Sequence, residues 1–292
     1  MTIKIITDSA CDILESDQQK FDIEIIPVYV VENETTYRDG IDISSEVVCD
    51  NMRKGVRYKT SQIPYGDFYK RFEELISMNQ PFIYLAFSSG LSGTYQAAAL
   101  AERDLNEKYP AAIFKVVDTK AVCYGLGHIV YGAAKAAAEG ASMDELMKRI
   151  NYYIDHVKHV FTVTDLQYLY RGGRLNKGTA IIGNMLNINP LLEVSKTGEL
   201  QQIDKVRGEK KLIKKMVDYL ETNGDQIKKQ TIGISHADNM ELVELFVKMA
   251  GKRFDTDRFK IVPLGSTVLT HSGPGTLAVF FFDEWKEAFQ FE

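Results

Sequence analysis

Small and hydroxyl-bearing residues gather in the segment Ser88–Tyr95, which reads SSGLSGTY and is the first candidate for chemistry in this chain. The apolar run over residues 82–87 predicts a buried strand before it, and residues 96–105 predict a helix after it. A loop that joins a strand to a helix N-terminus presents hydroxyls, free N–H groups and the positive end of the helix dipole. The segment is therefore a candidate site for an anionic oxygen group.

Ser92 lies within this segment, and its context decides between a nucleophile and a binding hydroxyl. The nucleophile elbow of lipases reads G-x-S-x-G, but here Thr94 stands where the second glycine belongs. The segment also fails as a Walker A loop and as a dinucleotide loop, because neither spacing occurs in it. A hydroxyl that binds an anion or caps the helix is favoured over a nucleophile.

Two other segments carry polar groups of a similar kind. Residues 59–62, with the sequence KTSQ, place two hydroxyls and an amide before a predicted helix. They either cap that helix or supply a second hydroxyl beside Ser92. His271 lies in residues 270–275, THSGPG, which predicts a glycine-rich loop around a histidine. A functional role for His271 stays open beside a structural one.

Cations surround a pair of glycines in the segment Arg171–Lys177. The cluster is either a charged surface turn or a site for an acidic ligand or an acidic partner. The pair His156 and His159 has a spacing that two metal ligands on one helix face would show, but no third ligand accompanies it. A metal site is therefore not expected.

The composition narrows the class of protein. The net charge is −5 and no block of Lys and Arg stands out, which disfavours nucleic-acid binding. No apolar run approaches the roughly 18 residues of a membrane span, and the short apolar run before Asp8 predicts a first strand rather than a signal peptide. Three widely spaced cysteines form no metal-binding pattern and indicate reduced thiols in a cytoplasmic protein. Those cysteines are Cys11, Cys49 and Cys123, of which Cys11 is the best candidate for a reactive thiol.

The predicted elements alternate between strand and helix through the first half of the chain. This alternation predicts an α/β domain with a largely parallel sheet, in which ligands bind at the carboxyl ends of strands. A new strand at 159–163 opens a second α/β half, and residues 268–282 are predicted as a strand, a loop with His271 and a last strand. We place the domains at residues 1–158 and 159–292.

Several segments together resemble the DegV family of bacterial fatty-acid-binding proteins over nearly the whole chain. One departure is Ile63, which intervenes before Pro64 where the family has proline directly after T-S-Q. The resemblance implies a two-domain α/β fold that holds one long-chain fatty acid, such as palmitate or oleate, between its domains. The matching segments are TDSACDI (7–13), KTSQ (59–62), SSGLSGTYQ (88–96), DTKAVCYGLG (118–127), LYRGGRLNKG (169–178), IIGNMLNINP (181–190) and HSGPG (271–275).

The resemblance also implies roles for single residues. Thr60 and Ser92 match the hydroxyls that bind the carboxylate, and His271 matches a histidine near that head group. Arg174 matches the last residue of the G-G-R motif, linked to the same polar network and to a partner, and Ser61 and Gly93 belong to that supporting set. Residues 179–188 and the last strand are candidate lining for the acyl chain.

Some family members act as the lipid-presenting subunit of a fatty acid kinase, in which a separate ATP-binding subunit phosphorylates the carboxylate. The resemblance thus implies a protein that is not catalytic alone and needs no cofactor, with transient contact to a membrane surface as an option. Two other hypotheses stay open: a serine hydrolase that uses Ser92 and His271, and an interaction protein that senses lipid without a kinase.

Overall fold

The computed structural model describes residues 2–175 and 188–286. A four-stranded sheet, in which all paired strands run parallel, forms the centre of the first half, in the order β2-β1-β6-β7. The predicted α/β class with a largely parallel sheet is confirmed. Its strands are β1 (Lys4–Asp8), β2 (Glu24–Ile26), β6 (Phe82–Ala86) and β7 (Phe114–Asp118).

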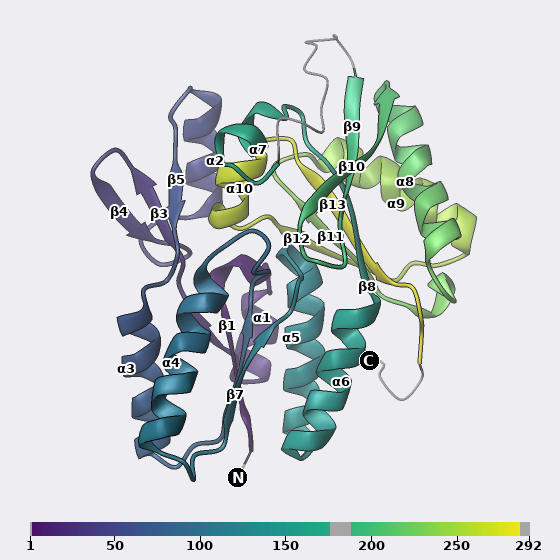
Figure 1. The fold of residues 1–292 in the computed structure, drawn as a ribbon. Coiled ribbons are helices and arrows are strands. Elements are labelled where there is room, and N and C mark those ends of the chain that lie inside the picture. Colours follow the sequence, from purple (N-terminus) through teal and green to yellow (C-terminus); the bar gives the residue numbers. More distant parts are fainter. Residues whose placement is uncertain (1, 176–187, 287–292) are drawn as a thin grey trace.

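Helices cover both faces of this sheet (Figure 1). On one face, α3 and α4 bury an aromatic cluster that includes Phe68, Phe72 and Tyr84. On the other, the alanine-rich α5 packs against β1 and also reaches the second sheet, so it joins the two halves. The helices are η1 (Ser9–Cys11), α1 (Glu15–Lys20), α3 (Tyr65–Ser77), α4 (Thr94–Lys108), α5 (Cys123–Ala138) and α6 (Met143–His156).

A small three-stranded sheet lies beside the first (Figure 1). The chain leaves the parallel sheet after Ile26 and enters β3 at Tyr29, since Pro27 between them cannot donate to a ladder. Residues 59–61 form β5, which pairs with β3. This sheet contains β3 (Tyr29–Glu32), β4 (Thr35–Arg38) and β5 (Lys59–Ser61), with α2 (Ser45–Arg53) between β4 and β5 in the chain.

The second half is built on a six-stranded sheet in the order β10-β9-β8-β13-β11-β12. Side chains of its strands alternate between two cores, as a strand period of two requires. In β13, Leu277, Val279 and Phe281 join the core with α8 and α9, whereas Ala278 and Phe280 face the first half. The elements are β8 (Val157–Thr162), α7 (Gln167–Arg171), β9 (Ile188–Val194), β10 (Leu200–Arg207), α8 (Glu209–Asn223), η3 (Ile227–Lys229), β11 (Ile232–His236), α9 (Met240–Phe254), β12 (Phe259–Pro263), α10 (Ser266–Ser272) and β13 (Leu277–Phe282).

The expected strand that begins at residue 268 is wrong, because Ser266–Ser272 forms the helix α10 and places His271 in its last turn. Two β-branched residues, Thr267 and Val268, favour a strand locally. Tertiary contacts override that preference, since α10 packs against α2, α7 and β5.

The division at residue 158 stays a prediction. The six-stranded sheet takes its first strand from Val157 onward, close to that boundary. Of the residues expected to line an acyl chain, 179–187 lie outside the described residues. None of the helices in the described ranges has both the length and the apolar character that crossing a bilayer requires.

Candidate functional site: a cavity between the two sheets

A cavity of about 350 Å³ lies where the Ser88–Tyr95 loop, β5, α10 and the inner face of the six-stranded sheet meet. Polar side chains line one part of it and apolar side chains line the rest. Its size is typical of a site for a small molecule. The lining includes the predicted residues Thr60, Ser61, Ser92, Gly93, Arg174 and His271, together with Gln62, Leu91, Thr94, Cys123, His159, Phe161, Thr267, Ser272, Ala278 and Phe280.

Thr60 and His271 meet across the two halves of the molecule. The Thr60 Oγ1 atom on β5 lies 2.7 Å from His271 Nε2 at the end of α10. The N-cap of α3 is Pro64 and no side chain caps this helix, so of the two alternatives for the KTSQ segment the helix cap is excluded. Pairing of β5 with β3 instead fixes the Thr60 side chain beside the cavity.

The His271 imidazole is held neutral. Burial, and then the nearby Arg174 guanidinium, lower its pKa from 6.5 to about 3. Its Nδ1 atom is buried and has no hydrogen-bond partner in the described part of the chain. The ring packs so closely on Gly172 that a Cβ atom there would lie 2.2 Å from Nδ1. If Nε2 carries the proton, it donates to Thr60 Oγ1, and the Thr60 hydroxyl is then free to donate into the cavity.

Ser92 is a second hydroxyl at the same end. Its Oγ atom lies 2.9 Å from Thr94 Oγ1 and accepts a hydrogen bond from the Thr94 N–H at 3.2 Å. Thr94 is the first residue of α4, so this contact lies at the positive end of a 15-residue helix. When the Thr94 hydroxyl also donates to Ser92, the Ser92 hydroxyl is left as a donor towards the cavity.

Arg174 supplies a cation that no acidic side chain of the described residues neutralises. Its guanidinium is half-buried, donates to the Leu91 carbonyl at 2.9 Å and to the Gly172 carbonyl at 2.5 Å, and lines the cavity. No carboxylate within the described ranges pairs with it. Burial lowers its pKa, which shows that its charge is poorly solvated. An anion in the cavity would supply the missing partner.

Two buried carboxylates of the first half hold the start of α10. Asp39 accepts from the Thr267 N–H at 3.1 Å and from the Thr267 hydroxyl at 2.5 Å, and also from Ser9. Asp12 accepts from the Gly265 N–H and from the Ser235 hydroxyl, both at 2.9 Å. Because α10 carries His271 at its other end, these contacts position the imidazole towards Thr60.

Asp12 gives a prediction about pH. Burial raises its pKa from 3.8 to about 7, so the folded state keeps a proton that the unfolded state has lost. Stability therefore falls as pH rises from about 4 to about 7. Measured by urea unfolding, the wild-type free energy of unfolding minus that of Asp12→Asn should decrease across this range and then level off. A difference that stays constant or increases with pH would contradict this assignment. Asn also tolerates the positive φ of 49° at this position.

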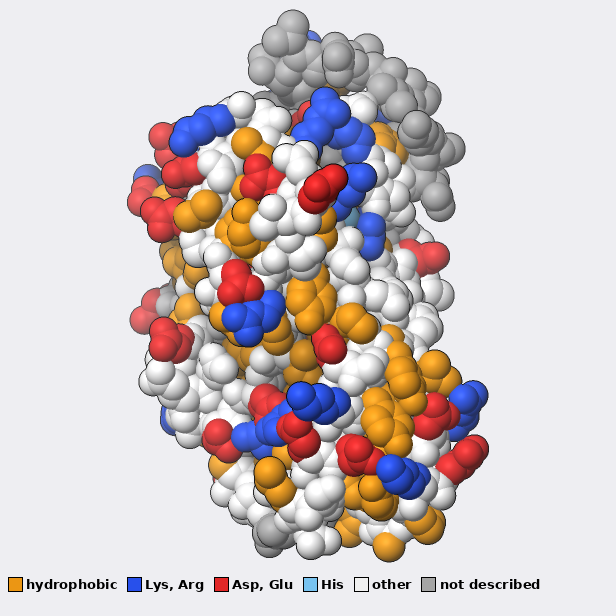
Figure 2. Space-filling view, turned by 90° about the vertical axis from the view of Figure 1, so that its left-hand side faces the viewer, with side chains coloured by type: hydrophobic (Ala, Val, Ile, Leu, Met, Phe, Trp, Pro, Cys, Tyr) orange, Lys and Arg blue, Asp and Glu red, His pale blue; other side chains and the backbone are white. Residues whose placement is uncertain are grey.

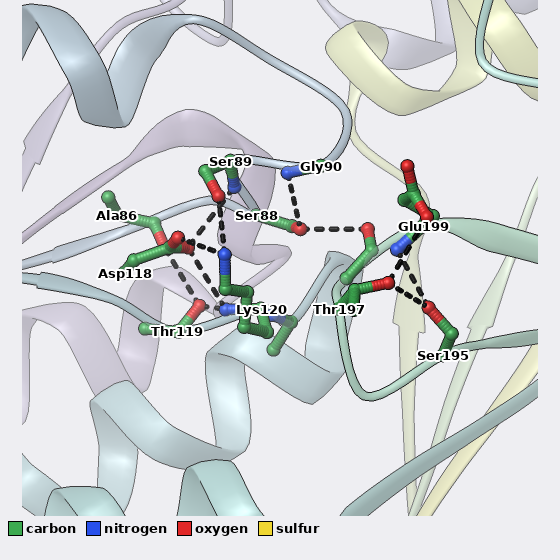
Figure 3. Close-up of polar contacts among 12 residues, drawn as sticks. Ala86, Ser88, Ser89, Gly90, Asp118, Thr119, Lys120, Ser195, Thr197 and Glu199 are labelled. Carbon is green, nitrogen blue, oxygen red and sulfur yellow. Dashed lines mark hydrogen bonds and ion pairs between the residues drawn. The ribbon is translucent and has the colours of Figure 1, made fainter.

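The turn between β9 and β10 lies against the Ser88–Tyr95 loop (Figure 3). Ser88 Oγ donates to the Gly198 carbonyl at 2.8 Å, which links the two halves directly. Gly198 has a φ of +80°, and a Cβ atom there would lie 2.0 Å from Ser88 Oγ, so only glycine fits. Since Leu200 of the same hairpin lines the cavity, the hairpin forms part of its wall.

Several lining residues were missed from the sequence, among them Gln62, Thr94 and Ser272. Gln62 is exposed and its side chain lies against Gly93, where a Cβ atom would be 2.0 Å from Gln62 Oε1. Ser272 Oγ is buried and finds no hydrogen-bond partner among residues 2–175 and 188–286. All three adjoin predicted residues in the chain, but their direction depends on strand pairing and helix start, which spacing alone does not give.

His156 and His159 lie on different elements, so they do not form a pair on one helix face. His156 ends α6 and binds Asp283 at 2.8 Å, whereas His159 is on β8 and lines the cavity. Among the described residues, no group of three His, Cys, Asp or Glu side chains could hold a metal ion. The three cysteines are buried and unbridged, and burial raises the pKa of the Cys11 thiol, which makes it unreactive.

The face shown in Figure 2 mixes both signs of charge. Lys and Arg side chains gather in its upper part, while acidic and hydrophobic side chains are interspersed with them elsewhere. No single-sign field covers this face, so its pattern differs from the basic stripe of a nucleic-acid interface.

Comparison with known proteins places the chain in a family. The sequence model described as "Uncharacterised protein, DegV family" matches residues 2–284. A DegV domain-containing protein of Clostridium perfringens is 38% identical over 285 residues, which cover 97% of this chain and 98% of that protein. A structure from Thermus thermophilus, described as fatty acid binding of a DegV family protein, matches with a TM-score of 0.85 at 26% identity and covers 96% of this chain and 99% of its own. A DegV lipid-binding protein from Thermotoga maritima matches with a TM-score of 0.83 at 30% identity, covering 98% of this chain and 100% of its own. The chain therefore belongs to the DegV family.

Proposed function

We propose that this protein binds one long-chain fatty acid in the cavity and presents its carboxylate to a separate ATP-dependent kinase subunit. The observation that carries the binding proposal is the Arg174 guanidinium, which lies half-buried at the cavity without a described carboxylate partner. The Thr60 and Ser92 hydroxyls line the same cavity. The related structures from Thermus thermophilus and Thermotoga maritima, described as fatty-acid-binding and lipid-binding, support the ligand class.

The carboxylate and the acyl chain contribute differently. A chain of about 14 methylenes gains roughly 0.8 kcal/mol for each one buried, or roughly 11 kcal/mol before the costs of binding. The hydrogen bonds to the carboxylate mainly offset the loss of its hydration. Affinity therefore comes from the apolar lining, including Phe161, Ala278 and Phe280, and the polar end fixes the register of the ligand.

The Thr60 and Ser92 hydroxyls would hold the carboxylate by hydrogen bonds, whereas Arg174 would attract it by its charge. In the neutral His271 arrangement, Nε2 donates to Thr60, Thr60 donates to one carboxylate oxygen and Ser92 donates to the same group. A neutral imidazole adds no charge repulsion to Arg174. The site thus holds an anion with hydroxyls and one nearby positive charge.

Ser92→Ala tests the head-group assignment. Loss of one hydrogen bond to the carboxylate costs about 1 to 1.5 kcal/mol, which weakens binding by about five- to tenfold. Calorimetric titration of delipidated protein with palmitate measures it. Ser89→Ala is the matched control, because Ser89 lies in the same loop but binds Lys120 and does not line the cavity. Equal affinities for both variants and the wild type would remove Ser92 from the head-group site.

Presentation to a kinase is the second part of the proposal, and it rests on the family resemblance. Ser61 and Gln62 line the cavity and are exposed, so the polar end lies near solvent while the apolar end is covered. A carboxylate oxygen held there could attack the γ-phosphorus of ATP on a partner, forming an acyl-phosphate and releasing ADP. Hydroxylamine trapping of the acyl-phosphate, with loaded protein, ATP and a candidate kinase subunit, tests this. Intact binding without any acyl-phosphate would reject presentation and leave binding in place.

The geometry disfavours a serine hydrolase. A nucleophile needs a base within hydrogen-bond reach and a group that orients the base. Ser92 bonds Thr94, while His271 Nε2 bonds Thr60, and no carboxylate in the described part of the chain bonds His271. We expect no labelling of Ser92 by a fluorophosphonate.

A further inference from the structure

His159 is a polar side chain in the apolar part of the cavity. Its exposed fraction is 4%, and it lines the cavity from β8 beside Phe161. The ring meets Phe280 edge to face, with centroids 5.4 Å apart. Burying an imidazole among apolar groups costs free energy, because its polar N–H group loses water and the surrounding apolar groups offer no acceptor.

The strand register places His159 far from the head group. In the pairing of β8 with β13, Phe161 lies opposite Ala278 and His159 lies opposite Phe280. Thr276, which also lines the cavity, comes just after the turn that follows α10 and His271. Phe280 comes four residues after Thr276, and this step spans about 13 Å along an extended strand. A carboxylate held by Thr60 and Ser92 would thus leave His159 beside the tail of a bound acyl chain.

The hydrogen bond to Val122 sets which nitrogen carries the proton. His159 Nε2 accepts from the Val122 N–H at 3.3 Å. The same atom lies against Gly125, where a Cβ atom would be only 2.2 Å away. Burial lowers the pKa of His159 to about 3, which keeps the ring neutral. A neutral ring whose Nε2 accepts carries its proton on Nδ1.

The Nδ1–H group has no acceptor among residues 2–175 and 188–286. The other polar groups near this part of the cavity are already paired. The Thr267 hydroxyl donates to Asp39, and the Cys123 thiol is bonded to Asp12. Ser272 is unpaired but follows His271 directly and so belongs to the polar end. His159 is therefore the donor that a ligand tail would meet.

We propose that His159 selects acyl chains that carry a hydroxyl or keto oxygen in the tail over saturated chains of equal length. This inference rests on the proposed fatty-acid binding. A saturated chain would bury the Nδ1–H without an acceptor, which is unfavourable. An oxygen on the chain would accept a hydrogen bond from the Nδ1–H group. This bond would offset part of the hydration that the oxygen loses, which a wholly apolar tunnel could not do.

Competition against a fluorescent fatty acid tests the selection, with stearate and with 9-, 10- and 12-hydroxystearate as probes. In the wild type, we expect at least one hydroxystearate to bind more tightly than stearate. His159→Leu should weaken that isomer by tenfold or more and strengthen stearate by a few-fold. His159→Gln, which keeps a donor and an acceptor, should restore the preference. Phe161→Leu, a control without a polar change, should shift stearate and hydroxystearate in the same direction.

The inference is overturned if no hydroxystearate binds more tightly than stearate in the wild type. An unchanged ratio in His159→Leu would overturn it as well. If His159→Leu unfolds because the Val122 N–H loses its acceptor, the affinity ratios of the wild type and of His159→Gln still test the inference. Tight stearate binding without discrimination rejects only the selection by His159, whereas absence of binding by any of these acids rejects the proposed function itself.

Discussion

Ala278→Phe should weaken palmitate binding by about 100-fold or more. Ala278 is 5% exposed, lines the cavity and pairs with Phe161 across β8 and β13. A phenyl ring at this point fills the apolar part and excludes the end of the chain. Loss of about four buried methylenes, at roughly 0.8 kcal/mol each, corresponds to about 200-fold in affinity.

Calorimetric titration with palmitate measures this effect, and thermal unfolding measures the fold. Ala111→Phe is the matched control, because Ala111 is exposed and lies outside the cavity lining. It should bind palmitate like the wild type. Full affinity in a folded Ala278→Phe variant would show that the acyl chain does not occupy this cavity.

Arg174→Ala should weaken palmitate binding by about 10- to 100-fold. The variant loses a cation near the carboxylate, where a charge-assisted contact is worth about 1.5 to 3 kcal/mol. It also loses the hydrogen bond to the Leu91 carbonyl that holds the loop before Ser92.

Arg171→Ala is the matched control for the charge. Arg171 lies three residues earlier, is exposed and stacks on Tyr168. Arg171→Ala removes one positive charge, as Arg174→Ala does, but should leave the affinity for palmitate unchanged. Raising the salt concentration should reduce the effect of Arg174 only partly, since its guanidinium is half-buried. Equal losses in both variants would indicate general charge attraction rather than a contact in the cavity.

The sequence predicted the parts of the site that depend on local pattern. Ser92 follows a buried parallel strand and precedes a helix, and both elements have strong periodicity. Parallel sheets gather ligands at that edge. The sequence alone therefore indicates this loop as a candidate site.

The parts that depend on distant contacts could not be predicted from local pattern. The sequence predicts a loop around His271, whereas the structure has the short helix α10. Its start is held by Asp39 and Asp12 from the other half, and local sequence does not indicate such contacts. Thr60 was read as a possible helix cap, since β5 has only three residues and exists through pairing with β3. The sequence predicts a strand from His159 onward, but not that its side chain lines the cavity, because that depends on the pairing of β8 with β13.

Family resemblance supplied what local pattern did not. It brought Thr60, Ser92, Arg174 and His271 together, and all four line the cavity. It gave no indication of the Asp12 and Asp39 contacts that orient α10, or of the imidazole of His159 in the apolar part. Those features follow only from the packing of the two halves against each other.

Native mass spectrometry of the intact protein, purified from cells without detergent, tests the central claim most directly. We predict a mass shift of one long-chain fatty acid per chain, lost on delipidation and restored by added palmitate. The Ala278→Phe variant should not regain it. An unliganded mass before and after the addition of palmitate and oleate would contradict the account.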